Sequence, residues 1–550
     1  MELSRQVIYQ LYPKSFYDSN GDGVGDLRGI IAKIPYLARL NVDMIWFNPF
    51  FVSPQNDNGY DVADYYHIDP AFGTMADFEE LVGRLKRVGI DVMLDMVFNH
   101  TSTAHEWFQR ALAGETTYQQ YYYIRPAKAD GSPPTNWHSK FGGSAWAPFG
   151  DTGQYYLHLY DPTQADLDWH NPAVRKACAD IVNFWQRKGV RGFRFDVINV
   201  IGKDQQLVDT LPGAKSKVLY TDRPIVHDYL KELNAASFGQ HDDVVTVGEL
   251  SSATLENSVA YTRPSNHELD MAFNFYHLKT DYDHGYKWTD RPFDFKALKQ
   301  IINDWAVGMA AGGGWQALFW NNHDQPRAVN RFGDAVHYRE KSAEMLATVN
   351  HLLRGTPFIY MGEEIGMTDP AYHRIEDYVD VESKNAYQAL LAQGHPERVA
   401  FHLVHVKSRD NARTPMQWTN EHLTAGFTSG QPWLRPTNQA TVNVADELAH
   451  GEIFQYYQRL IALRKRYDVV ANGDYRPLLV DHPQVLAYLR TTATQQLAVL
   501  NNFYPRKTTV MLPDEFKDAR VLISNYDRVV TGKSVILQPY QSVALLLEQH

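Results

Sequence analysis

The feature that most constrains the fold of this chain is an eightfold alternation between short β-branched or aromatic runs and amphipathic helical patterns. The helical patterns include LRGIIAKIPYLARL, ADFEELVGRLKRV and PAVRKACADIVNFWQRKG. Because strands that alternate with helices build parallel sheets, eight such units over about 460 residues predict a (β/α)₈ barrel, an α/β fold, with long insertions. The runs predicted as strands begin at Val7, Asp43, Asp91, Val190, Val244, Glu268, Gln316 and Thr356.

Long irregular segments interrupt the barrel pattern. The largest, residues 101–171, follows the third strand and is rich in Tyr, Trp, Gly and Pro. Loops of that length usually form a binding element or a lid, so we predict an inserted domain here. The catalytic barrel would then comprise 1–100 and 172–467, with an irregular subdomain at about 368–436. Short strands and turns over 468–550 predict a C-terminal antiparallel β-sandwich domain.

Charge and composition exclude several classes of protein. The formal net charge is -11, and its 53 basic and 64 acidic residues form no long block of one sign. This argues against nucleic-acid and membrane partners. We find neither a signal-peptide pattern nor the roughly 20 apolar residues of a spanning helix. The single cysteine, Cys178, suits a reducing compartment, so we expect a cytoplasmic monomer.

Polar residues at the carboxyl ends of the predicted strands are the candidates for chemistry, because barrel enzymes build their sites there. Strand alternation in GFRFD puts Arg194 and Asp196 on one face, where the guanidinium would keep the carboxylate ionised, as a nucleophile requires. A structural ion pair is the alternative. Glu249 follows the apolar run VVTVG, whose burial would raise its pKa toward that of a general acid. A capping or solvated glutamate is the alternative there.

Barrel geometry predicts that three strand-end carboxylates, Asp196, Glu249 and Asp324, converge on one rim. Paired carboxylates, one ionised and one protonated, are the apparatus of glycoside hydrolysis through an oxocarbenium-like transition state. Sugar binding also needs flat apolar platforms, for which Tyr65 and Phe141 are candidates. The alternative for both aromatics is that they pack the protein's own core.

Four segments, in order, resemble the signature segments of the α-amylase family of glycoside hydrolases: DMVFNH (95–100), GFRFDV (192–197), VGEL (247–250) and NNHD (321–324). The resemblance covers essentially the whole chain. It implies a barrel with an inserted domain after the third strand, a C-terminal β-domain and a retaining double displacement. It also implies Asp196 as nucleophile, Glu249 as acid/base, Asp324 as transition-state stabiliser, and sugar contacts from His100, Arg194 and His323.

Narrower features resemble the oligo-1,6-glucosidase branch of that family. NGYDVADY supplies Asp61 and SRDNARTPMQW supplies Arg413. The resemblance implies that this pair closes the pocket around a nonreducing glucose, and hence exo-action on small sugars. The QPDLN motif of the branch is QADLD here (164–168), a departure at two positions. Val197, after the implied nucleophile, resembles members that avoid α-1,4 linkages.

Longer matches resemble the phospho-α-glucosidases that split α,α-trehalose 6-phosphate into glucose and glucose 6-phosphate. They include SKFGGSAW (139–146) and FNFYHLKTDYDHGYKWT (273–289). Because the chain is acidic overall, a phosphorylated disaccharide would need a local cationic site. The candidates are Lys279, Lys287 and Lys203, and solvated surface lysines are the alternative.

Two other functions fit parts of this pattern. An oligo-1,6-glucosidase or dextran glucosidase acting on neutral isomaltosaccharides would not need those lysines. A barrel that has lost catalysis and serves as the ectodomain of a transporter assembly would need a membrane span. Such barrels usually lack the three carboxylates, so we set this function aside.

The stretch DSNGDGVGD (18–26) carries acidic or amide side chains at alternate positions, like the first nine places of an EF-hand calcium loop. The twelfth position, however, is Gly29, where a calcium sensor has a bidentate glutamate, and no helix precedes the loop. Resemblance to the oligo-1,6-glucosidase branch implies a structural Ca²⁺ here, and no organic cofactor. An acidic turn without metal is the alternative. The predicted ligands are the side chains of Asp18, Asn20, Asp22 and Asp26 and the carbonyl of Val24.

Overall fold

The computed structural model describes residues 2–530 and 532–548. The chain forms two compact units. The first unit comprises Trp46–Arg87 and Asp91–Asn274, and the second comprises Glu2–Ile45, Val88–Ile90 and the chain from Phe275 onward. Within the described residues, no helix combines the length and the apolar character needed to cross a bilayer.

Eight strands form a closed barrel in the order β1–β15–β14–β13–β12–β11–β5–β2. Neighbours such as β11 and β12, or β1 and β15, run parallel. Nearly every residue of these strands is buried, as expected for strands covered on both faces. All eight predicted strands and the (β/α)₈ class are confirmed. The strands are β1 (Ile8–Leu11), β2 (Met44–Phe47), β5 (Asp91–Met96), β11 (Gly192–Phe195), β12 (Val245–Glu249), β13 (Met271–Phe273), β14 (Gln316–Leu318) and β15 (Thr356–Tyr360).

In the first unit, the register of β5 and β11 sets Arg194 opposite Asp95, and the register of β11 and β12 sets it opposite Val247, two residues before Glu249. Helix α6 begins where Asn171 accepts a hydrogen bond from the amide of Ala173, with Pro172 in its first turn. The predicted helices α3 and α6 are confirmed. The first unit contains α3 (Met75–Arg87), α6 (Pro172–Arg187), α7 (Ile225–Ala236), α8 (Leu255–Thr262), β3 (Phe51–Val52) and β4 (Asp64–Ile68).

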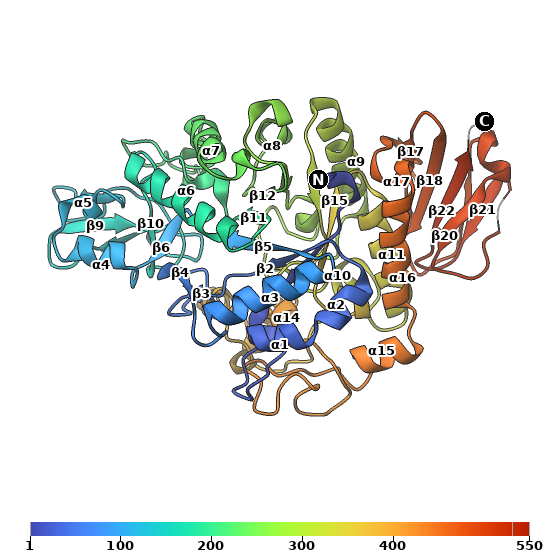
Figure 1. Cartoon of the computed structure of the whole chain (residues 1–550), viewed down its shortest axis with the longest axis horizontal. Helices are drawn as coiled ribbons and strands as arrows, with labels where there is room; N and C mark the ends of the chain where they lie inside the picture. The colour runs from blue at the N-terminus through green and yellow to red at the C-terminus, as the bar shows by residue number, and fades with distance from the viewer. Residues whose placement is uncertain (1, 531, 549–550) are drawn as a thin grey trace. The chain divides into compact units, whose positions relative to one another are not determined.

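Residues 101–171 form two small sheets (Figure 1, cyan). Strands β7, β9 and β8 form an antiparallel sheet, and β10 pairs with β6. Trp137, Trp146 and Leu157 are buried in one cluster with Val197 and Tyr220, so aromatic residues of this segment pack against the chain that follows β11. The elements are β6 (His100–Ser102), α4 (Glu106–Leu112), α5 (Thr116–Gln119), β7 (Ile124–Pro126), β8 (Trp146–Pro148), β9 (Gln154–Leu157) and β10 (Gln164–Asp166).

In the second unit, the pattern LRGIIAKIPYLARL forms two short helices, α1 (Leu27–Ala32) and α2 (Ile34–Leu40), rather than one. Pro35 lies in the first turn of α2. It has no amide hydrogen to donate to the carbonyl of Ile31, and its ring crowds that carbonyl, so α1 cannot continue through it. The other helices of the barrel part of this unit are α9 (Phe295–Gly312), α10 (Ala328–Phe332), α11 (Arg339–Leu352), α15 (Val444–His450) and α16 (Ile453–Arg466).

The stretch 368–436 is not irregular throughout, so that prediction was partly wrong. Helices α12 (Val381–Ala392) and α13 (Glu397–His405) form a hairpin, and the short helix α14 (Asp410–Arg413) follows. The hairpin buries a narrow stripe of Ala386, Leu390, Ala400 and Val404. On α12 the stripe is only Ala386 and Leu390, which gives this helix a weak amphipathic signal in the sequence.

The C-terminal antiparallel β-domain is confirmed (Figure 1, red). Its five-stranded sheet has the order β16–β17–β18–β22–β20, and β19 pairs with β21. Both sheets supply the core, to which Leu500, Val510 and Leu537 belong. Edge strand β16, which contains Pro477, was not predicted. The elements are α17 (Asp468–Ala471), β16 (Asp474–Leu478), β17 (Val485–Thr491), β18 (Gln495–Asn502), β19 (Thr508–Met511), β20 (Arg520–Ser524), β21 (Ser534–Leu537) and β22 (Ser542–Glu548).

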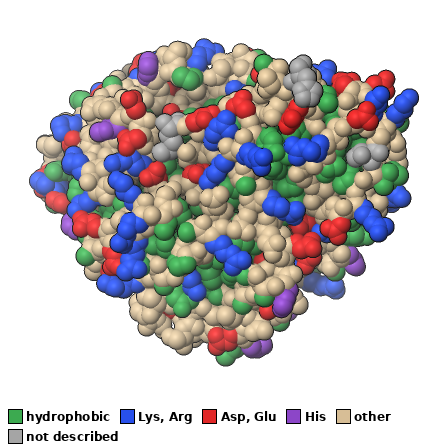
Figure 2. Space-filling view, turned by 45° about the vertical axis from the view of Figure 1, so that its right-hand side comes forward, with side chains coloured by type: hydrophobic (Ala, Val, Ile, Leu, Met, Phe, Trp, Pro, Cys, Tyr) green, Lys and Arg blue, Asp and Glu red, His purple; other side chains and the backbone are tan. Residues whose placement is uncertain are grey.

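The surface charges are mixed. On the face seen in Figure 2, basic and acidic side chains are interspersed among neutral ones, and no broad basic area gathers there. In the first unit, exposed ion pairs such as Lys176–Asp180 and Arg84–Glu80 also place the two signs of charge side by side. This face therefore offers no electrostatic footprint for a polyanion.

Candidate active site

One buried guanidinium organises the polar end of β11 and β12 in the first unit. Arg194 Nη1 lies 2.6 Å from Asp95 Oδ1 and 2.6 Å from Asp196 Oδ1, and its Nη2 contacts Glu249 Oε2. Burial alone would lower the pKa of Arg194, but the facing carboxylates of Asp95 and Asp196 hold it above its ordinary value. The two predicted catalytic carboxylates of this unit are thus brought together on one permanent cation.

The backbone turns sharply directly after Asp196. Val197 has φ +36°, a left-handed conformation that β-branched residues rarely adopt. Asp196 is held to β5 through its amide, which donates to Met96 O at 3.0 Å. The strained turn ends the strand and directs the chain away, so that Asp196 stays at the strand end with a side chain that is one-tenth exposed.

Asp95 completes this cluster and was missed from the sequence. It is almost fully buried and accepts hydrogen bonds from Tyr60 Oη at 2.8 Å and Trp46 Nε1 at 3.2 Å, besides its pairing with Arg194. Burial raises the pKa of Asp95 to about 7, against the opposing effect of Arg194. The available signal was the charged Asp95 within the apolar run DVMLDMVF. A buried barrel strand tolerates a charge only when that charge is paired.

His100 and Asp61 are both buried in the first unit. His100 Nε2 lies 3.1 Å from Tyr60 O and 3.2 Å from Gln164 Nε2. Burial lowers the pKa of His100, which favours a neutral imidazole. Asp61 accepts from Ser53 Oγ at 2.9 Å and from two backbone amides of its own loop, those of residues 56 and 57. The loop itself therefore fixes the position of the Asp61 carboxylate.

The two aromatic candidates have different surroundings. Tyr65 is 1% exposed and donates to Val97 O at 2.6 Å. Its ring packs against the rings of Phe51 and Phe98. The structure thus corrects the prediction for Tyr65, which packs the core and offers no platform. Phe141 lies on a loop, is half-buried and meets the ring of Tyr160 edge-on at 5.6 Å.

Lys203 does not fit the role of a phosphate ligand, and this prediction is corrected as well. The side chain is fully buried. Its ammonium lies 2.9 Å from Asp166 Oδ2, and it donates to Asn99 Oδ1 at 2.9 Å and to Val200 O at 2.8 Å. Two hydrogen bonds and one ion pair, all inside the protein, commit this ammonium, and its full burial keeps it from a substrate phosphate.

A second cationic cluster surrounds Asp324 in the second unit. Arg413 Nη2 lies 2.7 Å from Asp324 Oδ1, and Arg409 Nη1 lies 3.3 Å from the same oxygen. His323 is adjacent, with Nε2 3.3 Å from Asp324 Oδ2 and its carbonyl accepting from Arg413 Nε at 2.7 Å. Burial would raise the pKa of Asp380, but Arg409 and Arg413 hold it below its ordinary value. The sequence pointed to His323, Asp324 and Arg413 but missed Arg409 and Asp380.

Of the two remaining lysine candidates, Lys287 is the better defined. Its Nζ lies 2.6 Å from Glu382 Oε2, at the start of α12, and 4.7 Å from the centre of the Trp288 ring. Glu382 Oε2 also lies 3.4 Å from Arg409 Nε, which links Lys287 to the cluster around Asp324. Lys279 lies at the end of a 3₁₀ turn, His277–Lys279, 5.4 Å from the centre of the Tyr276 ring.

The loop 18–26 in the second unit is tightly organised by its own acidic side chains. Asp18 accepts from the amides of Asn20, Gly21 and Gly23 at 2.8–2.9 Å, and Asp26 caps α1 through the amide of Gly29. Across the described ranges, no group of three or more His, Cys, Asp or Glu side chains is placed to hold a metal. A cation here would therefore depend on the Asn20 amide and the Val24 carbonyl as well. An all-oxygen donor set of this kind suits a hard cation.

Comparison with known proteins agrees with the fold. A model described as "Alpha amylase, catalytic domain" matches residues 10–473, and one described as "Alpha-amylase SusG C-terminal domain" matches residues 485–544. The trehalose-6-phosphate hydrolases of Bacillus subtilis (strain 168) and Escherichia coli (strain K12) are 48% and 50% identical. The first match covers 99% of this chain and 98% of that protein, and the second covers 90% of each.

Other relatives extend this picture. The oligo-1,6-glucosidase of Parageobacillus thermoglucosidasius is 44% identical over 98% of this chain and 97% of its own. The crystal structure of Bacillus licheniformis trehalose-6-phosphate hydrolase superposes with a TM-score of 0.95 at 50% identity, covering all of both chains. With the barrel, the C-terminal β-domain and a family match over most of its length, the chain belongs to the α-amylase family of glycoside hydrolases.

Proposed function

We propose that this chain is a retaining, exo-acting α-glucosidase that hydrolyses α,α-trehalose 6-phosphate to glucose and glucose 6-phosphate. The observation that carries the chemistry is the contact of one buried guanidinium, Arg194, with both Asp196 and Glu249. The substrate is supported by the likeness to proteins named trehalose-6-phosphate hydrolase.

Each half of the reaction has a residue in this chain. The Asp196 carboxylate attacks the anomeric carbon of the nonreducing glucose, while Glu249 gives its proton to the departing glycosidic oxygen. Water then attacks the glucosyl ester on Asp196, its proton passes to Glu249, and glucose leaves with retained configuration. Arg194 holds the Asp196 carboxylate at the strand end through a contact of 2.6 Å. Asp324 would stabilise the positive charge that develops on the sugar, and His100, His323, Asp61, Arg413 and Phe141 would contact it.

The phosphate would be received by the lysines of the segment 273–289. Lys287 is supported by its position in a chain of charges that runs through Glu382 and Arg409 to Asp324. Lys279 is a second candidate from the same segment. A phosphate there would compete with Glu382 for the Lys287 ammonium. When no substrate is bound, Glu382 is the counter-ion of that ammonium.

The second candidate function is an oligo-1,6-glucosidase acting on neutral isomaltosaccharides. It is favoured by the pairing of Lys287 with Glu382, since a lysine that already has a carboxylate partner needs no phosphate to explain it. The two functions share the catalytic steps and differ only in whether the lysine acts on the substrate.

Activity assays separate these possibilities. We expect purified protein to release glucose faster from trehalose 6-phosphate than from trehalose or isomaltose, because only the first carries the phosphate.

The variants Asp196→Asn and Glu249→Gln should each lose at least about 1,000-fold in kcat while keeping the wild-type melting temperature. Isomaltose turnover equal to that of trehalose 6-phosphate would favour the second function, and a wild-type rate in either variant would refute the role given to that residue.

Asp95 should act as a positioning residue. We expect Asp95→Asn to lower kcat for p-nitrophenyl α-glucoside by about 10- to 100-fold with a smaller change in KM, because Arg194 loses one of its three counter-charges and binds Asp196 more strongly. Asp180→Asn, which removes an exposed carboxylate from α6, is the matched control and should be unchanged. Equal kcat in the two variants would contradict the positioning role.

Lys287→Ala tests the phosphate site. We expect a loss of about 10- to 100-fold in kcat/KM for trehalose 6-phosphate, mostly in KM, because a charge-assisted hydrogen bond is removed. Turnover of an uncharged aryl glucoside should change little. Lys296→Ala, at an exposed lysine of α9, is the control. A uniform loss on both substrates would argue for a structural role of the Lys287–Glu382 pair.

We also propose that the loop 18–26 binds Ca²⁺ through Asp18, Asn20, Asp22, Asp26 and the Val24 carbonyl. The ion would hold the first βα loop in place and take no part in bond cleavage. Cytoplasmic location and a monomeric state stay predictions from the sequence.

Chelation tests the metal proposal. We expect excess chelator to lower the melting temperature of the wild-type protein by a few degrees, since a ligand bound only to the folded state stabilises it. Asp22→Ala, at an exposed predicted ligand, should melt at the chelated temperature with or without chelator. Identical melting of the wild-type protein in Ca²⁺ and in chelator would count against a bound ion.

A further inference from the structure

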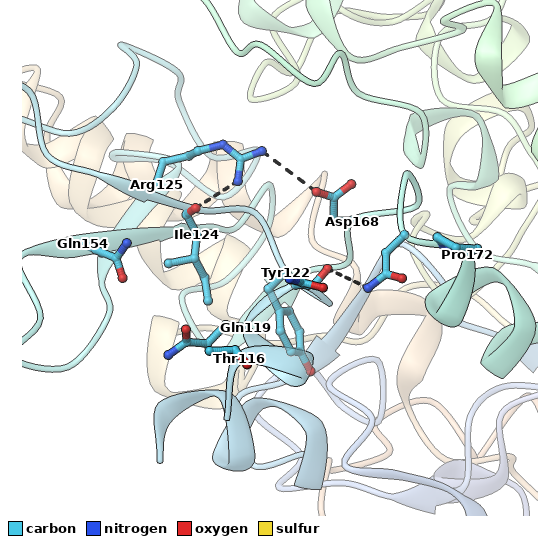
Figure 3. A pocket seen from close by; sticks show the side chains of 10 residues that line it. Thr116, Gln119, Tyr122, Ile124, Arg125, Gln154, Asp168 and Pro172 are labelled. Carbon is cyan, nitrogen blue, oxygen red and sulfur yellow. Dashed lines mark hydrogen bonds and ion pairs between the residues drawn. The ribbon is translucent and has the colours of Figure 1, made fainter. Parts of the chain in front are cut away.

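A hollow of about 520 Å³ lies in the first unit, on the inserted segment 101–171 and the start of α6. It is lined by side chains from α5, β7, β9 and the first turn of α6, and none of these side chains is a catalytic candidate (Figure 3). Its volume lies within the range of ligand sites, about 300–1,000 Å³.

Two opposite charges face each other across one side of the hollow. The closest oxygen and nitrogen of Asp168 and Arg125 are 3.9 Å apart, too far for a hydrogen bond. Asp168 Oδ1 accepts from the amide of His170 at 3.0 Å, and the other oxygen, Oδ2, faces Arg125 (Figure 3). A ligand hydroxyl placed between them could accept from the guanidinium and donate to the carboxylate at once.

Uncommitted amide and hydroxyl groups complete the polar lining. Among the described residues, the side chains of Gln120, Gln154 and Thr116 make no hydrogen bond to the protein. Asn171, by contrast, is committed, because it caps α6 and donates to Gln120 O at 3.0 Å. Groups that both donate and accept, without net charge, match the hydroxyls of a sugar or polyol.

An apolar surface lies beside these polar groups. Ile124 and Pro172 line the hollow with apolar side chains that are partly or fully exposed. Tyr122 is buried beneath them, with its hydroxyl engaged with Thr101 Oγ1 at 2.7 Å. Thr116, Gln119 and Tyr122 lie across the hollow from Arg125 (Figure 3). Apolar faces next to hydrogen-bonding groups suit the two kinds of surface that a pyranose ring presents.

We propose that this hollow is a second carbohydrate site, for a neutral mono- or disaccharide, separate from the catalytic carboxylates. The charges of Arg125 and Asp168 offset each other, so a phosphate dianion gains no net attraction there. Asp168 is also the last residue of QADLD, one of the two positions where this motif departs from QPDLN. The departure introduces the one carboxylate among the residues that line the hollow.

The test uses maltose as the probe and keeps the catalytic pocket filled with a saturating iminosugar inhibitor. Saturation-transfer NMR should still detect maltose on the wild-type protein. Gln154→Trp, which fills the hollow, should bind maltose about tenfold more weakly or not at all. Gln120→Ala, which removes one hydrogen-bonding group, should weaken maltose binding less than about tenfold. Gln300→Trp, at an exposed glutamine of α9, is the matched control and should bind as the wild type does.

Each variant should hydrolyse p-nitrophenyl α-glucoside at the wild-type rate, which shows that it is folded and that the hollow is not the catalytic site. Loss of the maltose signal when the inhibitor is added to the wild type would overturn the proposal. So would an unchanged signal in both hollow variants, or displacement of maltose by inorganic phosphate.

Discussion

The buried guanidinium of Arg194 is the interaction on which the polar end of the barrel in the first unit depends. Three carboxylates, Asp95, Asp196 and Glu249, lie around it. Buried charges are costly unless they are paired, and three acids this close would repel one another without a shared cation. Arginine suits this position because it stays protonated and presents several donors in fixed directions, whereas lysine offers a single point charge.

Around Asp324 in the second unit, arginines likewise pair with more than one carboxylate. Arg413 and Arg409 lie between Asp324 and the fully buried Asp380, so each cation has carboxylates on two sides. The chain of charges continues through Glu382 to Lys287. Removing one member of such a network leaves a buried charge unpaired, and this is why single substitutions here should affect substrate recognition and catalysis more than surface ion pairs do.

Strands and signature residues could be predicted because their signals are local. Eight short apolar runs were predicted as strands, four of them with polar residues at their ends, and every run contains a barrel strand. The helical hairpin α12–α13 was missed because its buried stripe is narrow. Lys203 and Tyr65 looked accessible from sequence, yet both are buried, with their polar atoms engaged by partners distant in the chain. Asp95 and Arg409 were missed because their partners are equally distant.

The sequence by itself determined the order of strands and helices, the family, and the carboxylates at the strand ends, since these follow from hydrophobic periodicity and short contiguous motifs. The tertiary structure alone decided which charges share a partner: that Arg194 serves three acids, that Lys203 is committed to Asp166, and that Asp168 faces Arg125 across a hollow. Pairing and burial depend on distances between residues far apart in the chain, and a linear pattern carries no information on those distances.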